Sequence, residues 1–345
     1  MLAGGGTAGH VNPLLATADR LADLGHSIEV IGTQEGLESR LVPDRGYKLT
    51  TIPKLPFPRK LGLSTISFPF KFLAISLGLR KRVREADVVV GFGGYVSAPV
   101  YLAAKIFGTP LVIHEANALP GIANRFGSKL TKHVAISFPS KLAGELIGVP
   151  LREEIASAEG YDIGQARVEL GLDPSKPVLL VTGGSQGAQK INRVVVEATD
   201  KLRAAGVQVY HIAGSGNEYP EKISDGYVRV SYCNSMELAI RACDFAISRA
   251  GAATVSELTA MGVPALFIPY PVGNGEQRHN VAQLIEADAS LIVEDKDFDV
   301  EFINSELIPV LSSKKRLKEM GQKMKQFGKL DATEKLVTMA LGAIK

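Results

Sequence analysis

Small and polar residues follow several predicted strands, and their types suit the binding of a nucleotide. The stretch from Ser248 to Glu257 passes from a strand at 245–247 through Gly251, Ala252 and Ala253 into a helix. Small residues there let a ligand lie against unpaired backbone N–H groups and the positive end of the helix dipole, as in an anion site. Glu257 follows one turn later, and its carboxylate suits the vicinal diol of a ribose. The stretch therefore predicts a nucleotide across the helix start.

Three turns in the first half of the sequence occupy equivalent places. They are Gly4 to His10 after a short strand, Gly91 to Ser97 after a strand at 88–90, and His114 to Asn117 after a strand at 111–113. Ligands of open parallel sheets bind outside the carboxyl ends of the strands, so we expect these turns to converge on one crevice. The candidate site residues in these turns are His10, Tyr95, Glu115 and Asn117.

The elements that would position these turns alternate between strand and helix patterns, which predicts parallel sheets. The strand at 134–136 is expected to close the first sheet. Later strands are expected at 178–182, 207–213, 228–230, 245–247, 265–268 and 291–293. The order of strand, glycine pair, small hydroxyl residue and helix occurs at Gly5-Gly6-Thr7 and again at Gly183-Gly184-Ser185. We therefore predict an α/β protein with two Rossmann-like, doubly wound domains that face a cleft.

The polar stretch at 153–164 is typical of a domain boundary. We expect a first domain over 1–152 and a second over 153–328. Residues 329–345 contain an amphipathic helix that is expected to pack back on the first domain.

Length and composition bound the function. A chain of 345 residues can bury two cores. The net charge of +3, with 22% charged residues, indicates no nucleic-acid partner. Neither the two cysteines nor the six histidines have metal-ligand spacing. The sequence therefore predicts no metal centre.

Apolar and basic residues interleave between Pro53 and Arg84. This pattern fits either a core helix with a solvated basic end or a surface that sits among the headgroups of an anionic membrane. In the second case, Phe68, Phe70 and Phe72 are expected to contact the membrane.

Six motifs, in order along nearly the whole chain, resemble glycosyltransferase family 28. They are Gly4 to His10, 93–97, 114–117, 183–187, Arg249-Ala250-Gly251 with 254–257, and 275–280. This resemblance implies a GT-B fold, with the donor nucleotide mainly in the C-terminal domain and the acceptor mainly on the N-terminal one. It implies transfer of N-acetylglucosamine from UDP-N-acetylglucosamine to the C4 hydroxyl of the N-acetylmuramyl unit of lipid I, forming lipid II for peptidoglycan. The reaction would be inverting, without metal or cofactor, by a peripheral protein at the cytoplasmic face of the cell membrane.

Matching motif to motif, the resemblance also implies the residues around the donor. They are Thr7, Ala8, Gly9, Asn117, Arg152, Ser185, Cys233, Ala252, Ala253, Thr254, Val255, Ser256, Glu257 and Gln277, with Asn192 as a further candidate. Cys233 stands where the family usually has a bulky apolar residue and where the backbone meets the uracil. Ala116 stands where some relatives carry Gln.

Displacement of UDP by a sugar hydroxyl needs a base for the proton, stabilisation of an oxocarbenium-like centre and relief of charge on the diphosphate. The helix after Gly251 and the glycine turns can serve the diphosphate, and Arg152 could add charge. His10 has the best intrinsic pKa for the base, and Glu115 is the alternative. Tyr95 is the third catalytic candidate.

Several alternatives compete with this interpretation. Asp295-Lys296-Asp297 has the Asp-x-Asp spacing of metal-dependent glycosyltransferases, but it lies in a wholly charged run, which favours a solvated loop. A nicotinamide oxidoreductase would need a sharper Gly-x-Gly-x-x-Gly turn with an acid about 20 residues later. A UDP-N-acetylglucosamine 2-epimerase shares the fold and the donor but needs no membrane face. A non-catalytic nucleotide-sugar-binding protein could lose His10, Tyr95 and Asn117.

Overall fold

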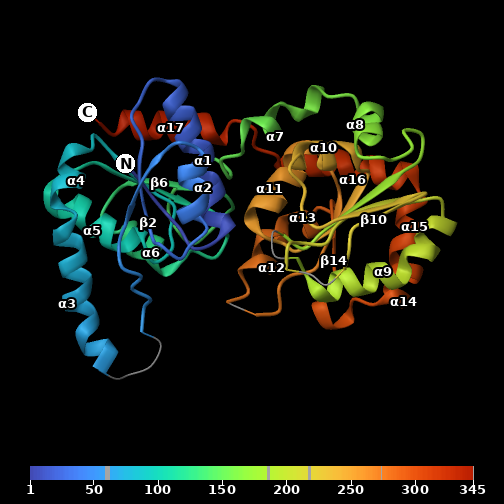
Figure 1. Cartoon of the computed structure of the whole chain (residues 1–345), viewed down its shortest axis with the longest axis horizontal. Coiled ribbons are helices and arrows are strands. Elements are labelled where there is room, and N and C mark those ends of the chain that lie inside the picture. Colours follow the sequence, from blue (N-terminus) through green and yellow to red (C-terminus); the bar gives the residue numbers. More distant parts are fainter. Residues whose placement is uncertain (59–62, 185–186, 217–218, 273, 345) are drawn as a thin grey trace. The chain divides into compact units, whose positions relative to one another are not determined.

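The computed structural model describes residues 1–58, 63–184, 187–216, 219–272 and 274–344. The chain divides into two compact units, one of Met1–Arg152 with Leu330–Lys345 and one of Glu153–Lys329. Each unit is built on its own largely parallel sheet, with helices packed against it (Figure 1).

In the first unit, the described strands form a parallel sheet in the order β3-β2-β1-β4-β5-β6-β7. The strands are β1 (Leu2–Ala3), β2 (Glu29–Gly32), β3 (Lys48–Thr51), β4 (Val89–Gly91), β5 (Leu111–Glu115), β6 (His133–Ile136) and β7 (Glu145–Leu146). The prediction that the strand at 134–136 closes this sheet is wrong, because β7 pairs with β6 beyond it. The two exposed residues of β7 carry no apolar pattern long enough to reveal it.

Both faces of this sheet are covered, because successive strand residues point to opposite sides. Leu2 and Val30 belong to one buried cluster, whereas Ala3 and Ile31 belong to another. The helices of the unit are α1 (Ala8–Asp23), α2 (Glu38–Asp44), α3 (Leu63–Gly78), α4 (Arg80–Glu85), α5 (Ser97–Phe107), α6 (Ile122–Gly127) and α17 (Ala332–Gly342).

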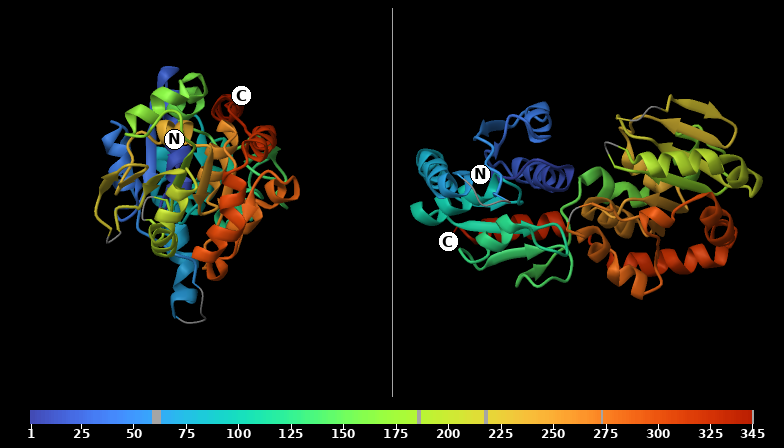
Figure 2. Two further views of the ribbon diagram at one scale, coloured as in Figure 1. Left: turned by 90° about the vertical axis from the view of Figure 1, so that its right-hand side faces the viewer. Right: turned by 90° about the horizontal axis from the view of Figure 1, so that it is seen from below.

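The C-terminal helix α17 packs on the first unit. Leu336, Val337 and Ala340 are buried in the same cluster as Leu14 of α1. The right-hand view of Figure 2 shows the C-terminal end of the chain beside the elements of this unit. The apolar face of the helix, spaced at three and four residues, accounts for this packing.

In the second unit, the described strands have the order β10-β11-β9-β8-β12-β13-β14. They are β8 (Val178–Thr182), β9 (Gln208–Ile212), β10 (Lys222–Ser224), β11 (Tyr227–Val230), β12 (Phe245–Ser248), β13 (Ala265–Phe267) and β14 (Leu291–Ile292). Only β10 is antiparallel within this described sheet. Its helices are α7 (Glu153–Ser157), α8 (Ile163–Glu169), α9 (Gln189–Ala204), α10 (Met236–Ala242), α11 (Ala252–Met261), α12 (Glu276–Asn280), α13 (Ala282–Glu286), α14 (Val300–Phe302), α15 (Ile308–Leu311) and α16 (Lys314–Phe327).

The two sheets place their glycine turns at the same topological point. In each, the strand order reverses beside the first strand of the unit, between β1 and β4 and between β8 and β12. Ligands of doubly wound folds bind at this switch point, outside the carboxyl ends of the strands. The predicted two-domain α/β fold is confirmed, and its topology directs attention to the turns after these four strands.

Candidate active site

The first glycine turn presents a histidine at the carboxyl end of β1. Helix α1 begins at Ala8, so His10 lies in its first turn. The imidazole Nδ1 lies 3.2 Å from the carbonyl oxygen of Gly5 and 3.3 Å from the hydroxyl of Thr7. The helix geometry thus turns the ring back over the glycine loop.

The contacts of His10 define its tautomer. A carbonyl oxygen only accepts, so Nδ1 carries the proton in the bond to Gly5 and Nε2 carries the lone pair. Nε2 points toward Gly93, where an added Cβ would lie 3.3 Å from it. Burial lowers the pKa of His10 below its ordinary value, opposed by the charge of Glu115, the Gly5 bond and the charge of Glu38. The ring is therefore a neutral base at neutral pH.

Glu115, the alternative base, is buried and fully engaged by its own loop. Its Oε1 accepts a hydrogen bond from the Asn117 N–H at 2.9 Å, and its Oε2 accepts from the Gly121 N–H and the Asn124 amide, both at 2.9 Å. With both oxygens occupied, this carboxylate anchors the loop after β5. His114 beside it is fully buried, and burial lowers its pKa to about 4.

The remaining candidates of the first unit lie at its surface to different degrees. Thr7 is exposed, and Ala8, Gly9, Asn117 and Arg152 are partly exposed. Tyr95 follows Gly94 and is exposed at the start of α5.

In the second unit, α11 begins with a first turn that no described side chain caps. Gly251 is its N-cap, and none of the described residues in that turn is acidic. Ala252 and Val255 are buried on the core side. Ala253, Thr254, Ser256 and Glu257 are partly exposed. The free N–H groups of this turn can therefore bind an anion directly.

Two amide side chains hold the loop before α11. The Oε1 atom of Gln277 accepts from the backbone N–H of Ala250 at 3.1 Å and of Tyr270 at 2.9 Å. The Asn280 amide donates to the Ala250 oxygen at 3.2 Å. Gln277 therefore joins two loops at the carboxyl edge of this sheet.

The prediction that Asp295 lies in a solvated loop is wrong. Its carboxylate pairs with the Arg249 guanidinium at 2.6 Å, and only 20% of the Asp295 side chain is exposed. Arg249 also lies over the ring of Tyr270. Asp295 thus supports the loop before α11, whereas Lys296 and Asp297 are exposed as predicted. Among the described residues, no three His, Cys, Asp or Glu side chains form a metal-binding group.

Asn192 lies inside the core, where it holds the turn after β9. Its amide donates to the Ala213 oxygen at 2.8 Å, and its Oδ1 lies 3.0 Å from Nε2 of His211. Burial and the charge of Arg229 lower the pKa of His211 to about 3, so the ring is neutral. Cys233 is partly exposed and receives a weak hydrogen bond from the Tyr210 hydroxyl. Ser185 lies outside the described residues.

Sequence reasoning missed Glu38. It is fully buried behind the first glycine turn, and its Oε2 accepts from the Gly6 N–H at 2.8 Å. The signal was an acid at the start of a helix whose neighbours Gly32 and Gly36 lack side chains.

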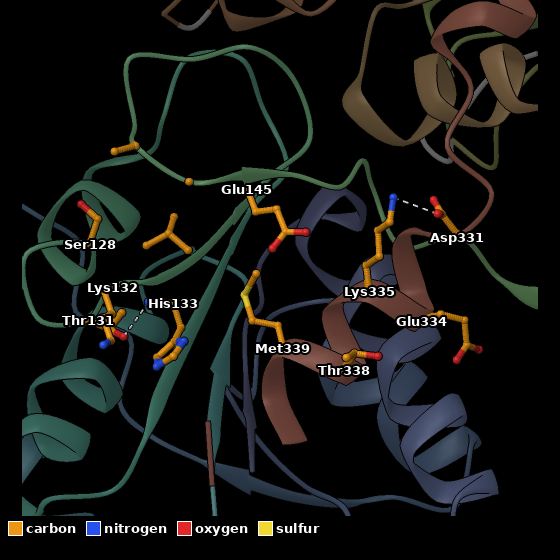
Figure 3. Close-up of a pocket in the computed structure, with 13 residues that line it drawn as sticks. Ser128, Thr131, Lys132, His133, Glu145, Asp331, Glu334, Lys335, Thr338 and Met339 are labelled. Carbon is orange, nitrogen blue, oxygen red and sulfur yellow. Dashed lines mark hydrogen bonds and ion pairs between the residues drawn. The ribbon is translucent and has the colours of Figure 1, made fainter. Parts of the chain in front are cut away.

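A further groove opens elsewhere on the first unit, between α17 and the strands β6 and β7 (Figure 3). Its volume is about 850 Å³, and His133 at the amino end of β6 lines it. No predicted site residue contributes to its described lining. The groove is thus separate from the turns at the carboxyl ends of the strands.

Two α/β units of this topology, with glycine turns at both switch points, define the GT-B class of glycosyltransferases. The crystal structure of Acinetobacter baumannii MurG matches with a TM-score of 0.80 and 28% identity, covering 99% of both chains. CalG4, the calicheamicin glycosyltransferase, has the same fold with a TM-score of 0.65 and 16% identity, covering 99% of this chain and 97% of its own.

The sequence comparisons define the family. Residues 1–136 match the glycosyltransferase family 28 N-terminal domain and residues 178–336 the C-terminal domain. UDP-N-acetylglucosamine–N-acetylmuramyl-(pentapeptide) pyrophosphoryl-undecaprenol N-acetylglucosamine transferases are similar over the whole chain. The protein from Clavibacter sepedonicus is 47% identical, covering 100% of this chain and 96% of its own, and that from Streptomyces avermitilis is 46% identical, covering 100% and 98%. The chain belongs to glycosyltransferase family 28.

Proposed function

We propose that this enzyme transfers N-acetylglucosamine from UDP-N-acetylglucosamine to lipid I and so forms lipid II in peptidoglycan synthesis. The observation that carries the proposal is that one chain holds both a neutral histidine at a switch point and an open helix start followed by Glu257. The full-length similarity to transferases named for this reaction supports the choice of substrates.

The second unit binds the donor in this proposal. The N–H groups at the start of α11 take the diphosphate, and Glu257 takes the ribose hydroxyls. Gln277, Cys233 and the turn at 183–187 complete the nucleotide site. Backbone N–H groups and Arg152 can stabilise the departing diphosphate, which supports a reaction without a metal.

His10 is the base. Its Nε2 takes the proton of the C4 hydroxyl while the hydroxyl oxygen bonds to C1 of the donor sugar. The bond from C1 to the diphosphate breaks and leaves its electron pair on UDP. This single displacement inverts the anomeric centre. Thr7, Ala8, Gly9, Asn117 and Tyr95 surround the reacting sugars, and Glu115 holds the Asn117 loop in place.

The acceptor is carried by lipid, and α3 gives the first unit a face that suits a membrane surface. No helix in the described ranges is long and apolar enough to span a bilayer. Ile66, Phe70, Leu73 and Leu77 are exposed and recur at spacings of four, three and four residues. Lys71 and Arg80 are exposed on the same segment. We propose that this face meets the cytoplasmic leaflet and that the protein is peripheral.

The phenylalanines on α3 divide between this face and the interior. Phe70 is 74% exposed, but Phe68 and Phe72 are only partly exposed. The centroids of their rings lie 5.7 Å apart, and the centroid of the Phe72 ring lies 5.9 Å from that of Phe126. Of the three rings, we therefore expect only that of Phe70 to contact the membrane.

The test is transfer of labelled N-acetylglucosamine from its UDP form to a short-chain lipid I analogue, with and without EDTA. We expect disaccharide product in both reactions. Loss of product with EDTA would contradict metal independence. Donor epimerised at C2 without disaccharide would instead favour the 2-epimerase.

A further inference from the structure

Glu38 is a buried carboxylate that joins the first glycine turn to the strand beside it. Its Oε2 accepts from the Gly6 N–H at 2.8 Å, and its Oε1 accepts from the N–H and hydroxyl of Thr33 at 2.9 and 2.8 Å. The side chain is fully buried at the start of α2. Both oxygens therefore act as hydrogen-bond acceptors for the loops on either side.

The sequence around Glu38 leaves room for this one side chain. A Cβ added at Gly5 would lie 2.2 Å from its Oε1, and one at Gly36 would lie 2.0 Å from its Oε2. Gly32 is similarly close, with a Cβ 2.6 Å from Cγ. Three glycines from three segments therefore fix the carboxylate against the loop that carries Thr7 and His10.

We propose that Glu38 is the positioning residue for the base: it holds the Gly6 N–H, and so sets the loop whose Gly5 oxygen orients His10. The inference rests on the proposed function, because it assigns a role in that reaction. Glu38 itself does not touch the substrates. A glutamine cannot replace it, because its side chain has an NH₂ group in place of one of the two accepting oxygens. That NH₂ group would face the N–H of Gly6 or of Thr33, and neither can accept a hydrogen bond.

The charge of Glu38 also acts on the pKa of His10, so the pH profile of the reaction tests the proposal independently of the loop geometry. The titratable groups around His10 are Glu38 behind the glycine turn, Glu115 after β5 and His114 in β5. The carboxylates favour the protonated ring, so removing Glu38 lowers the pKa of His10 further. Since the base must be neutral, the acid limb of the pH profile should then move to lower pH.

The experiment compares E38Q, G36A and G342A with the wild-type enzyme. We expect E38Q to lower kcat about 100-fold, because a misplaced base loses near-attack geometry. The KM for UDP-N-acetylglucosamine should stay within about twofold, and the acid limb should move to lower pH. G36A, which displaces Glu38 without touching the turn, should lower kcat in the same sense while the KM for the donor stays unchanged. Gly342 in α17 faces open space, so G342A should behave as wild type.

Wild-type kcat in E38Q would overturn the inference, as would an unshifted acid limb together with a raised donor KM and a lowered melting temperature. If E38Q does not fold, G36A decides: unchanged kcat in G36A overturns the inference. A wild-type enzyme that transfers no sugar contradicts the proposed function instead, and the two failures are thus distinct.

Discussion

The two units hold their ligand loops with different chemistry. In the first unit, the buried carboxylates of Glu38 and Glu115 each accept three hydrogen bonds from donors, most of them in the loops themselves. In the second unit, amide side chains hold the loops. Asn192 and Asn280 donate to backbone oxygens, which a carboxylate cannot do. Gln277 accepts from backbone N–H groups, as a carboxylate also could, so hydrogen bonding alone does not explain the amide at position 277.

The charge of the side chain explains the choice between carboxylate and amide better. Carboxylates near His10 favour a ring that accepts a proton, and this suits a base. Beside a diphosphate the same charges would repel the ligand, whereas a neutral amide anchors the loop without that cost. Asp295, which lies near the donor loop, is paired with Arg249 and so fits this rule. This difference fits the proposed roles, with proton transfer in the first unit and diphosphate binding in the second.

Replacing His10, the proposed base of the first unit, should have the largest effect on the rate of transfer. His10→Ala is expected to lower kcat by about 10²-fold to 10⁴-fold, the usual contribution of a general base. UDP affinity measured by titration calorimetry should hardly change, because in the proposed function the second unit binds the diphosphate. His26→Ala, an exposed histidine of the same unit, is the control. Nearly full turnover in His10→Ala would remove it from the role of base.

Glu257 tests whether the second unit binds the nucleotide. Glu257→Ala should raise the KM for UDP-N-acetylglucosamine about 10-fold to 100-fold, since hydrogen bonds to a charged group are worth about 1.5–3 kcal/mol. The pH dependence of kcat should stay as in the wild type, because His10 is untouched. An unchanged affinity for UDP would place the ribose elsewhere.

Gln277 offers the sharpest test of amide against carboxylate. Gln277→Glu can still accept the bonds from Ala250 and Tyr270, but it adds a negative charge at the donor loop. We expect donor KM to rise about 10-fold at low salt and less at high salt, because the Debye length falls from about 30 Å at 0.01 M to 3 Å at 1 M.

The matched control is Gln322→Glu, which adds the same charge to an exposed position. Gln322 shares a groove with Pro177 and Asp244, just before β8 and β12, and so lies at the amino edge of the sheet. Equal effects in both variants would mean that net charge matters and that the choice of an amide at 277 does not.

The sequence was informative where a local rule is strong. Apolar runs followed by small residues predicted the strands and turns of both sheets, because buried parallel strands and tight turns leave little choice of residue. It failed where the element is short or exposed, as for β7 and β10.

The site was only partly predictable for a different reason. His10 was predicted from its residue type and its place in a turn, and Gln277 from the family resemblance alone. The contact of Glu38 with the first glycine turn is visible only in the fold, which brings Gly5 and Gly36 to the same carboxylate although they are 31 residues apart in sequence. The charged run around Asp295 likewise carries no sign that Arg249, 46 residues earlier, pairs with it. Pairings between distant segments carry no local pattern, so composition and spacing cannot reveal them.

Membrane contact should show the smallest effect and concerns the first unit alone. Phe70→Ser removes the most exposed ring of α3, and full burial of such a side chain is worth about 1.5–3 kcal/mol. Because a peripheral helix buries its face only in part, we expect binding to vesicles of phosphatidylcholine and phosphatidylglycerol to weaken about fivefold. Phe72→Ser is the control. The Phe72 ring packs on Phe126, so this substitution should lower the melting temperature and leave vesicle binding unchanged. Donor affinity should be unchanged in Phe70→Ser, because in the proposed function the second unit binds UDP. Equal vesicle binding by Phe70→Ser and the wild type in a sedimentation assay would mean that the exposed face of α3 does not meet lipid.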